Sequence, residues 1–259
     1  MTIIAAISIV GTAGAAPPGD ASSARKSTTI VLVHGAFAGS SSWNSVIAKL
    51  ARDGYPVIAA ANPLRGLKTD ADYVARIVRD VRGRVLLVGH SYGGGVISMA
   101  AEGSDNVKGL VFVAGFAPEA GESAVSLGNQ FPTGTLGQTL TPPIPQADGS
   151  KDVYIAQEKY WKQFAADVPA ANAVQMAATQ RPITVGALGE PAGPGAWKKL
   201  PSWFIWGSAD RNIPHTLHAF MAKRAGAKEA VEVKGASHVV MISHPDEVAA
   251  MIERAAAAP

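Results

Sequence analysis

The segment LLVGHSYGG, residues 86–94, runs from an apolar stretch into a serine, Ser91, that is hemmed in by glycines. Its central five residues match the pattern G-x-S-x-G, between a predicted strand at Arg84–Val88 and a predicted helix at Tyr92–Glu102. A strand, a very tight turn and a helix in this order form the elbow that exposes a nucleophilic serine. Larger residues at the flanking glycines would collide with the backbone. The segment predicts that Ser91 is a nucleophile; the alternative is a glycine-rich turn with an incidental serine.

Short apolar segments and amphipathic segments alternate on both sides of this elbow. The predicted strands are Thr29–Val33, Pro56–Ala60, Arg84–Val88, Val107–Val113, Trp203–Trp206 and Ala230–Val233. The predicted helices are Ser42–Asp53, Asp70–Val81 with Thr69 as its N-cap, Tyr92–Glu102, Pro214–Ala225 and Pro245–Ala256. This alternation predicts an α/β fold with a mostly parallel sheet of about six strands and helices on both faces.

One long segment interrupts the alternation. Residues 118–197 are rich in Pro, Gly, Thr and Gln, and helical periodicity is confined to stretches such as Asp152–Asp167 and Ala170–Thr179. A segment of this length is too long for an ordinary loop. We therefore expect a lid (cap) insertion at 118–197 in a core formed by residues 28–117 and 198–259.

Composition limits the classes of protein to consider. The chain has 259 residues, 47% hydrophobic and 17% charged, with a formal net charge of +3. These values favour a globular domain and give no basic cluster for a nucleic-acid partner. No apolar run is long enough for a membrane span. The absence of cysteine excludes disulfides, thiolate metal ligands and a cysteine nucleophile.

The first 27 residues differ from the rest of the chain. A short apolar run at Thr2–Val10 precedes small residues at Ala13 and Ala15, as in a signal peptide and its cleavage site, followed by a linker. No Lys or Arg precedes the run, so the alternatives are a misassigned start or an unstructured tail. We expect a secreted or periplasmic protein if the signal operates, and a cytoplasmic one otherwise.

A serine hydroxyl needs a general base to become a nucleophile. Among six histidines, His238 lies in a loop, Gly235–His238, that directly follows the last predicted strand. This position can reach over the carboxyl edge of the sheet, so His238 is the expected base. We expect other positions for the remaining histidines: His34 at a turn, His90 inside the elbow with its side chain directed elsewhere, His244 at a helix start, and His215 and His218 on a helix surface.

The base needs a carboxylate that fixes its tautomer. Asp210 ends the segment WGSAD, residues 206–210, after the preceding strand. The chain order Ser91, Asp210, His238 is the order of α/β-hydrolase triads. Glu119 and Glu122, after the fourth strand, are the rival acids.

A tetrahedral intermediate also needs two hydrogen-bond donors for its oxyanion. One expected donor is the N–H of Tyr92, the residue after the nucleophile. The second is expected from the loop after the first strand, residues 34–39, where the N–H of Ala36 is the natural candidate.

Four segments together resemble the α/β-hydrolase superfamily: VLVHGAFAGSSSW (31–43), VGHSYGG (88–94), FIWGSAD (204–210) and GASHVVMISHPDEV (235–248). The resemblance spans nearly all of residues 28–256. It is strongest to the small-cap serine esterase branch, which contains plant methyl-ester esterases, hydroxynitrile lyases and related bacterial carboxylesterases. That branch implies ester hydrolysis without cofactor or metal, in a pocket between cap and sheet.

Two departures narrow the expected chemistry. Dehalogenases and epoxide hydrolases of this fold carry an aspartate at the elbow, whereas this chain carries Ser91. Related hydroxynitrile lyases carry a lysine after the catalytic histidine and a threonine in the oxyanion loop. This chain has Val239 and Gly35-Ala36 at those places, which favours hydrolysis.

We therefore expect a carboxylesterase for small to medium esters with an apolar or aromatic acyl part, acting as a monomer or homodimer. Aromatic and apolar side chains are expected to line its pocket, although those from the lid could equally form lid core: Phe37, Phe116, Tyr160, Trp161, Phe164 and Val239. The alternatives are a lactonase or C–C bond hydrolase with the same triad, and a ligand receptor on a hydrolase scaffold.

Overall fold

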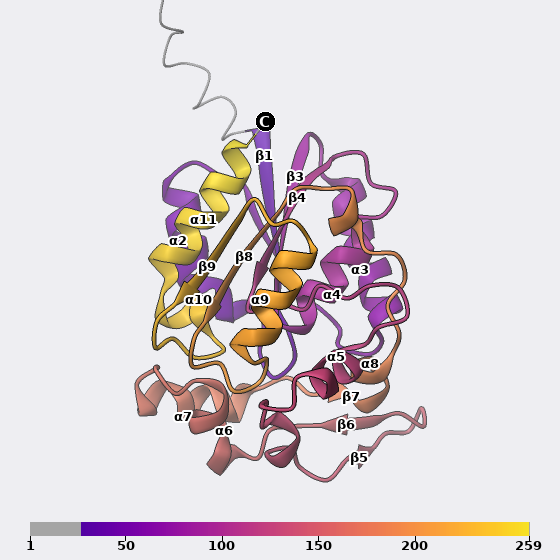
Figure 1. Cartoon of the computed structure of the whole chain (residues 1–259), viewed down its shortest axis with the longest axis vertical. Helices are drawn as coiled ribbons and strands as arrows, with labels where there is room; N and C mark the ends of the chain where they lie inside the picture. The colour runs from indigo at the N-terminus through magenta and orange to yellow at the C-terminus, as the bar shows by residue number, and fades with distance from the viewer. Residues whose placement is uncertain (1–26, 259) are drawn as a thin grey trace, which may run out of the picture.

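A single parallel sheet with helices on both faces forms the core of the computed structural model, which describes residues 27–258 (Figure 1). The strand order is β2-β1-β3-β4-β8-β9, and every adjacent pair is parallel. The strands are β1 (Thr28–Val33), β2 (Val57–Ala60), β3 (Arg84–His90), β4 (Val107–Val113), β8 (Ser202–Gly207) and β9 (Glu229–Val233). The predicted fold class is confirmed. Nearly all of the predicted signal peptide and linker lies outside the described residues.

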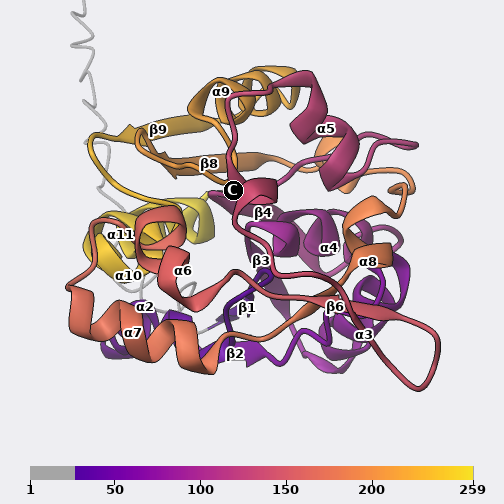
Figure 2. The same ribbon diagram turned by 90° about the horizontal axis from the view of Figure 1, so that it is seen from below.

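Two groups of helices cover the sheet (Figure 2). One face carries α2 (Asn44–Arg52), which follows the short 3-10 helix η1 (Ser40–Trp43), and the C-terminal α10 (Val240–Ser243) and α11 (Pro245–Ala257). The other face carries α3 (Leu67–Asp80), α4 (Tyr92–Ala100) and α9 (His215–Arg224). None of the helices within residues 27–258 has the length and apolarity to cross a membrane.

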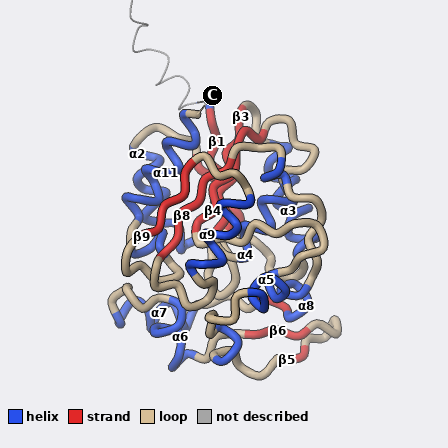
Figure 3. The backbone as a smooth tube through the Cα atoms, viewed as in Figure 1, coloured by secondary structure: helices blue, strands red, loops and turns tan. Residues whose placement is uncertain are grey.

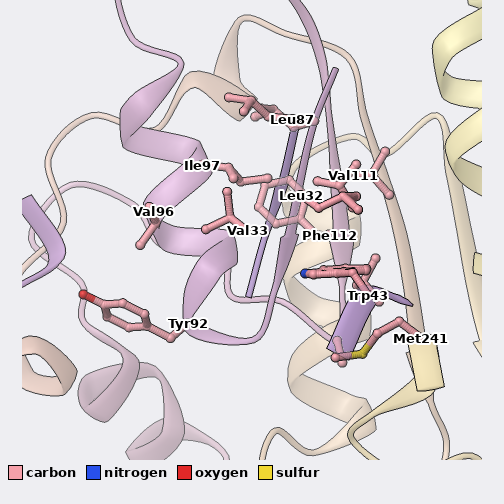
Figure 4. Close-up of a cluster of buried hydrophobic side chains, with 14 of the residues drawn as sticks. Leu32, Val33, Trp43, Leu87, Tyr92, Val96, Ile97, Val111, Phe112 and Met241 are labelled. Atoms are coloured by element: carbon pink, nitrogen blue, oxygen red, sulfur yellow. The ribbon is translucent and has the colours of Figure 1, made fainter. Parts of the chain in front are cut away.

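The core lies between the sheet and these helices (Figure 4). Val96 and Ile97 of α4 lie on one side of the central strands, while Trp43 and Met241 lie on the other. All four side chains are fully buried. Burying an apolar side chain of this kind stabilises a fold by about 1.5–3 kcal/mol. The packing of these side chains against both faces of the sheet also holds the strand ends near Ser91 in place.

The chain between β4 and β8, residues 114–201, forms a layer below the carboxyl ends of the strands and, after residue 189, returns along the side of the core to the start of β8 (Figures 1 and 3). We call it the insertion segment. Its helices are α5 (Ala124–Gln130), α6 (Gln157–Phe164), α7 (Ala170–Thr179) and α8 (Val185–Gly189), with 3-10 turns η2 (Leu136–Gln138) and η3 (Ala196–Lys198). A small antiparallel sheet joins β5 (Ile144–Pro145), β6 (Lys151–Val153) and β7 (Ile183–Thr184).

The predicted helix over Asp152–Asp167 is only partly correct. Its first residues belong to strand β6, and the helix itself, α6, covers Gln157–Phe164. Asp152 pairs with Thr184 of β7, and its carboxylate lies 2.6 Å from Arg65 Nη1. A distant ion pair and a strand partner therefore override the local helical pattern.

The start of α3 also differs from the prediction. The helix begins at Leu67, and its N-cap is Gly66 rather than Thr69. The carboxylate of Glu190, from the insertion segment, accepts the backbone N–H groups of Leu67 and Lys68. A carboxylate near a helix N-terminus satisfies free N–H groups and complements the helix dipole, so a distant residue replaces the local cap.

Candidate active site

The turn between β3 and α4 holds Ser91 in a strained conformation. Ser91 has φ 54° and ψ −125°, a region that non-glycine residues rarely adopt and that costs about 1–3 kcal/mol. A Cβ on Gly89 would lie 2.5 Å from the Gly93 carbonyl oxygen, and one on Gly93 would lie 2.5 Å from the Val33 oxygen. The elbow expected from the sequence is therefore present, and both glycines are required by close backbone approach.

The loop after β1 packs directly against the Ser91 side chain. A Cβ on Gly35 would lie 2.6 Å from Ser91 Cβ and 3.2 Å from its Oγ. The next residue is Ala36, and the N–H of Phe37 beyond it donates to the Arg181 carbonyl at 2.9 Å. Tyr92 is the first residue of α4, so its N–H has no carbonyl partner within the helix. The two expected oxyanion donors thus lie on segments that adjoin the serine.

Asp210 and His238 meet although 28 residues separate them. Asp210 Oδ2 lies 2.7 Å from His238 Nδ1, and both side chains are completely buried. Asp210 follows β8 and His238 follows β9, the strand next to it in the sheet. A carboxylate only accepts hydrogen bonds, so His238 Nδ1 carries the hydrogen and the other ring nitrogen, Nε2, is the one free to accept a proton.

Four donors surround the Asp210 carboxylate. Oδ1 accepts the backbone N–H groups of Asn212 at 2.8 Å and Ile213 at 3.0 Å. Oδ2 accepts His238 Nδ1 and also His218 Nε2, the latter at 3.2 Å. Burial alone would raise the pKa of Asp210, but its interactions with His238 and His218 outweigh burial and hold the pKa well below its usual range. The carboxyl group is therefore ionised whenever the protein is folded near neutral pH.

His90 links the elbow to the loop that carries His238. Its Nε2–H donates to the His238 carbonyl oxygen at 3.1 Å, and the two rings lie 4.8 Å apart between centroids. His238 Nε2 is buried and has no hydrogen-bond partner among the described residues. A direct bond from Ser91 Oγ is therefore not formed, as is common for catalytic hydrogen bonds without substrate. The described contacts thus join Asp210 to His238, and His238 to His90, the residue directly before Ser91, which is 8% exposed.

His218 lies in a place that the sequence analysis did not anticipate. The prediction of a surface position is wrong, because its side chain is 1% exposed and contacts Asp210. Its neighbours Leu217 and Met221 are also buried, so helical periodicity could have placed His218 on the inner face of α9. His215, by contrast, is 54% exposed and lies 3.3 Å from Glu232.

The rival acids lie elsewhere. Glu122 forms a two-pronged ion pair with Arg224, at 2.8 and 2.9 Å. Glu119 lies 2.8 Å from Lys198. Within residues 27–258, no three His, Asp or Glu side chains are grouped so that they could hold a metal.

Helix α6 of the insertion segment contacts each loop of the site. The Tyr160 hydroxyl donates to the Phe37 carbonyl at 2.9 Å, next to Ala36. Gln163 Nε2 donates to Asn212 Oδ1 at 2.7 Å, beside Asp210. The Phe164 ring lies edge-on to His238, 5.1 Å between centroids. One helix therefore contacts the loop after β1, the Asp210 loop and His238.

An apolar cavity of about 410 Å³ lies between the insertion segment and the core. Phe116, predicted as a pocket residue, lines it, and its N–H donates to the Ser91 carbonyl at 3.0 Å. Asn212 lines it as well, next to the Asp210 loop. The lining contains no charged side chain: Phe116, Ala124, Val125, Gly128, Asn129, Phe131, Pro132, Gly134, Leu136, Gly137, Leu140, Leu188, Asn212 and Pro214.

The other predicted pocket residues have different surroundings. Phe37 and Tyr160 border a second, more polar hollow of about 730 Å³, between α7 and the start of α2. Phe164 and Val239 are fully buried. Trp161 is 41% exposed, and its Nε1–H donates to the Val168 carbonyl at 2.9 Å. The sequence analysis missed the large apolar side chains that line the 410 Å³ cavity from the insertion segment: Val125, Phe131, Leu136, Leu140 and Leu188.

A parallel sheet with a strained serine elbow after β3 and an Asp–His pair on the loops after β8 and β9 is typical of the α/β-hydrolase class of fold. A family model described as the alpha/beta hydrolase family matches residues 30–251, so the chain belongs to that family and the resemblance inferred from its motifs is confirmed.

Individual relatives extend over most of the chain. Norfluorocurarine synthase 2 from Strychnos sp is 28% identical over 251 residues, covering 84% of this chain and 91% of that protein. The pyrethroid hydrolase of Sphingobium wenxiniae is 27% identical over 250 residues, covering 90% and 89%. The crystal structure of polyneuridine aldehyde esterase has a TM-score of 0.74 at 17% identity, covering 86% and 96%, and this likeness concerns the fold.

Proposed function

We propose that the protein is a serine carboxylesterase in which Ser91, His238 and Asp210 form the catalytic triad. The observations that carry this proposal are the 2.7 Å bond between buried Asp210 and His238, and the serine held at φ 54° directly after His90, which bonds to the His238 carbonyl. Backbone strain of this kind persists only where surrounding structure enforces it, and it clusters at active sites. Family membership and the relative named as a pyrethroid hydrolase support the same chemistry.

The first half of the reaction forms an acyl-enzyme. His238 Nε2 takes the proton from Ser91 Oγ as the oxygen attacks the ester carbonyl carbon. The negative charge that develops on the carbonyl oxygen is stabilised by the N–H groups of Ala36 and Tyr92, and the N-terminus of α4 adds a favourable dipole. The tetrahedral intermediate collapses as the C–O bond to the alcohol breaks, and His238 returns its proton to the leaving oxygen.

The second half releases the acid. His238 takes a proton from a water molecule, which attacks the acyl carbon, and the proton then passes back to Ser91 Oγ. Asp210 keeps the hydrogen of His238 on Nδ1 throughout and stabilises the imidazolium that forms in each half. The four hydrogen bonds to its carboxylate leave Asp210 no freedom to turn away.

The apolar cavity, which the proposed triad itself does not line but which adjoins Ser91 through Phe116, supports one class of substrate. A volume of about 410 Å³ suits a small to medium molecule, and an apolar lining disfavours a charged one because no ion partner is present. We therefore expect uncharged esters with an apolar or aromatic acyl part. The insertion segment acts as the lid, since it supplies Phe131, Leu136 and Leu188 to the cavity wall.

Turnover of p-nitrophenyl esters tests this proposal. The expected result is hydrolysis of acetate, butyrate and benzoate esters, with loss of turnover in Ser91→Ala. A succinate half-ester of similar size, which carries a free carboxylate, should react at least tenfold more slowly. Ser98→Ala is the matched control, since Ser98 is buried in α4 about two helical turns beyond the elbow. Tight binding of these esters without turnover would favour the receptor alternative instead.

A further inference from the structure

We propose that His218 is a positioning residue, which acts through Asp210 to orient His238 and to limit how strongly the carboxylate attracts the His238 proton. The proposal rests on the triad function proposed above and extends it to a fourth side chain. It concerns a histidine that is not itself among the residues lining the 410 Å³ cavity.

The geometry places two imidazoles on a single oxygen. Asp210 Oδ2 lies 2.7 Å from His238 Nδ1 and 3.2 Å from His218 Nε2. The His218 ring stacks on Trp206, with centroids 5.6 Å apart and planes at 19°. Trp206 belongs to β8 and His218 to α9, so two regular elements hold the ring in place. Such support restricts Oδ2 to one position relative to His238.

The protonation state of His218 follows from its surroundings. The carboxylate only accepts, so the His218 nitrogen that faces it must carry a hydrogen. Burial lowers the pKa of His218 despite the opposing influence of Asp210, so the ring is neutral near neutral pH. His218 is therefore a neutral donor: it occupies a lone pair of Asp210 without cancelling the carboxylate charge that stabilises the His238 imidazolium.

Other ionisable groups near this pair are few among the described residues. Asp210 and His238 face His218 directly, and His215 lies one turn away on the same helix. His90, from β3, faces His238 on its far side. Burial lowers the pKa of His90, so it is neutral and adds no charge to the site near neutral pH. The electrostatic environment of His238 is therefore determined mainly by Asp210 and by the groups that donate hydrogen bonds to Asp210.

Removing the His218 donor has two consequences with defined signs. Oδ2 loses a constraint, so His238 samples unproductive orientations and kcat falls. The carboxylate also has one hydrogen bond fewer, which makes it a stronger acceptor for His238 and favours the protonated ring. The acid limb of the pH profile of kcat/KM should then move to higher pH.

Two substitutions distinguish the role of the His218 hydrogen-bond donor from that of its aromatic ring. His218→Phe keeps an aromatic ring on Trp206 and removes the donor, whereas His218→Gln places an amide N–H at nearly the reach of Nε2. His215→Gln, on the exposed side of the same helix, is the matched control. For His218→Phe we expect kcat to fall about tenfold, the factor that corresponds to one lost hydrogen bond. The acid limb of the pH profile of kcat/KM should move to higher pH by about half a unit. His218→Gln should keep both values within about twofold and 0.2 pH unit of the wild type, because it keeps that bond.

An NMR titration of the ring protons provides the same readout without a substrate. In His218→Phe, the titration midpoint of His238 should move upward relative to the wild type, and in His218→Gln it should not. If the wild type hydrolyses no ester, the proposed function fails while this titration still decides the role of His218. If His218→Phe does not fold, His218→Asn, whose amide is too short to reach Asp210, replaces it. An unmoved midpoint and an unmoved acid limb in the donor-free variant would overturn the proposal, as would equal effects of Gln and Phe.

Discussion

Replacing Asp210 by asparagine is the sharpest single perturbation of the proposed triad. The substitution keeps the size of the side chain and exchanges one accepting oxygen for an NH₂ group. Two backbone donors, the N–H groups of Asn212 and Ile213, point at one position, and two ring nitrogens point at the other. The amide oxygen of the introduced side chain must therefore face the backbone, because two N–H groups cannot face an NH₂ group without losing both bonds.

This forced orientation determines the size of the effect. The NH₂ group then faces His238 Nδ1, which must become an acceptor, so the hydrogen of the neutral ring moves to Nε2. A ring in that tautomer cannot take the Ser91 proton. The exchange of tautomer in a Ser-His-Asp triad lowers kcat about 10⁴-fold, which corresponds to about 5.5 kcal/mol of transition-state stabilisation.

Steady-state kinetics with a p-nitrophenyl ester at pH 8 measures this loss directly. Asp246→Asn serves as the control, since Asp246 is 78% exposed and pairs with Lys49 on the surface. Circular dichroism and a thermal melt establish that Asp210→Asn is folded. A loss of less than about tenfold in the folded variant would refute the assignment of Asp210, because the tautomer argument allows no such residual activity.

Three further results are expected. Gly35→Ala should lower kcat about 10²–10³-fold, because the added Cβ would lie 2.6 Å from Ser91 Cβ and displace the loop that carries an oxyanion donor. The control is Gly189→Ala, whose Cβ would meet nothing within 4 Å. Equal activity of the two variants would exclude the loop from the site. Tyr160→Phe leaves the buried Phe37 carbonyl without its 2.9 Å donor, so urea unfolding should show a loss of about 1–3 kcal/mol, and an unchanged midpoint would contradict this. Burial lowers the pKa of His34 from 6.5 to about 4, so as the pH falls His34 takes up a proton in the unfolded chain before it does so in the folded protein. The free energy of unfolding should therefore fall by about 3 kcal/mol as the pH drops from 6.5 to 4. A free energy of unfolding that is constant over this range would oppose the burial of a neutral His34.

Much of the core could be predicted because its sequence signals are local. The strands β1, β3 and β4 each contain a run of four apolar residues, and the elbow is a fixed five-residue pattern. The order of Ser91, Asp210 and His238 along the chain then follows from the order of the strand ends. The contact between Asp210 and His238 requires only that β8 and β9 pair in parallel, which the strand order supplies.

The insertion segment was less accessible because distant contacts decide its structure. Strand β6 exists because Asp152 pairs with β7 and with Arg65, and the start of α3 depends on Glu190. None of these partners is near in sequence. The apolar side chains of the cavity are likewise spread over α5, η2 and α8, so no single window of sequence shows a pocket. A local pattern cannot report which of two distant segments will pack together.

His218 illustrates a different limit. The buried residues of its helix come in two pairs one turn apart, and the spacing of Leu217 and Met221 marks the inner face. A histidine on that face is more often a satisfied core residue than part of a site. Only the position of Asp210 Oδ2, 3.2 Å away, gives His218 its proposed role.

Covalent labelling with a fluorophosphonate tests the central claim most directly. The reagent forms a Ser Oγ–phosphorus bond and releases fluoride only where a serine is activated by a base. Mass spectrometry of the tryptic peptide covering residues 85–108, which also contains Ser98 and Ser104, identifies the modified atom. We predict a single adduct on Ser91, formed more than about 10²-fold more slowly in His238→Gln, as expected when the general base is lost. An adduct on another residue, or an unchanged rate of labelling in His238→Gln, would contradict the proposed triad.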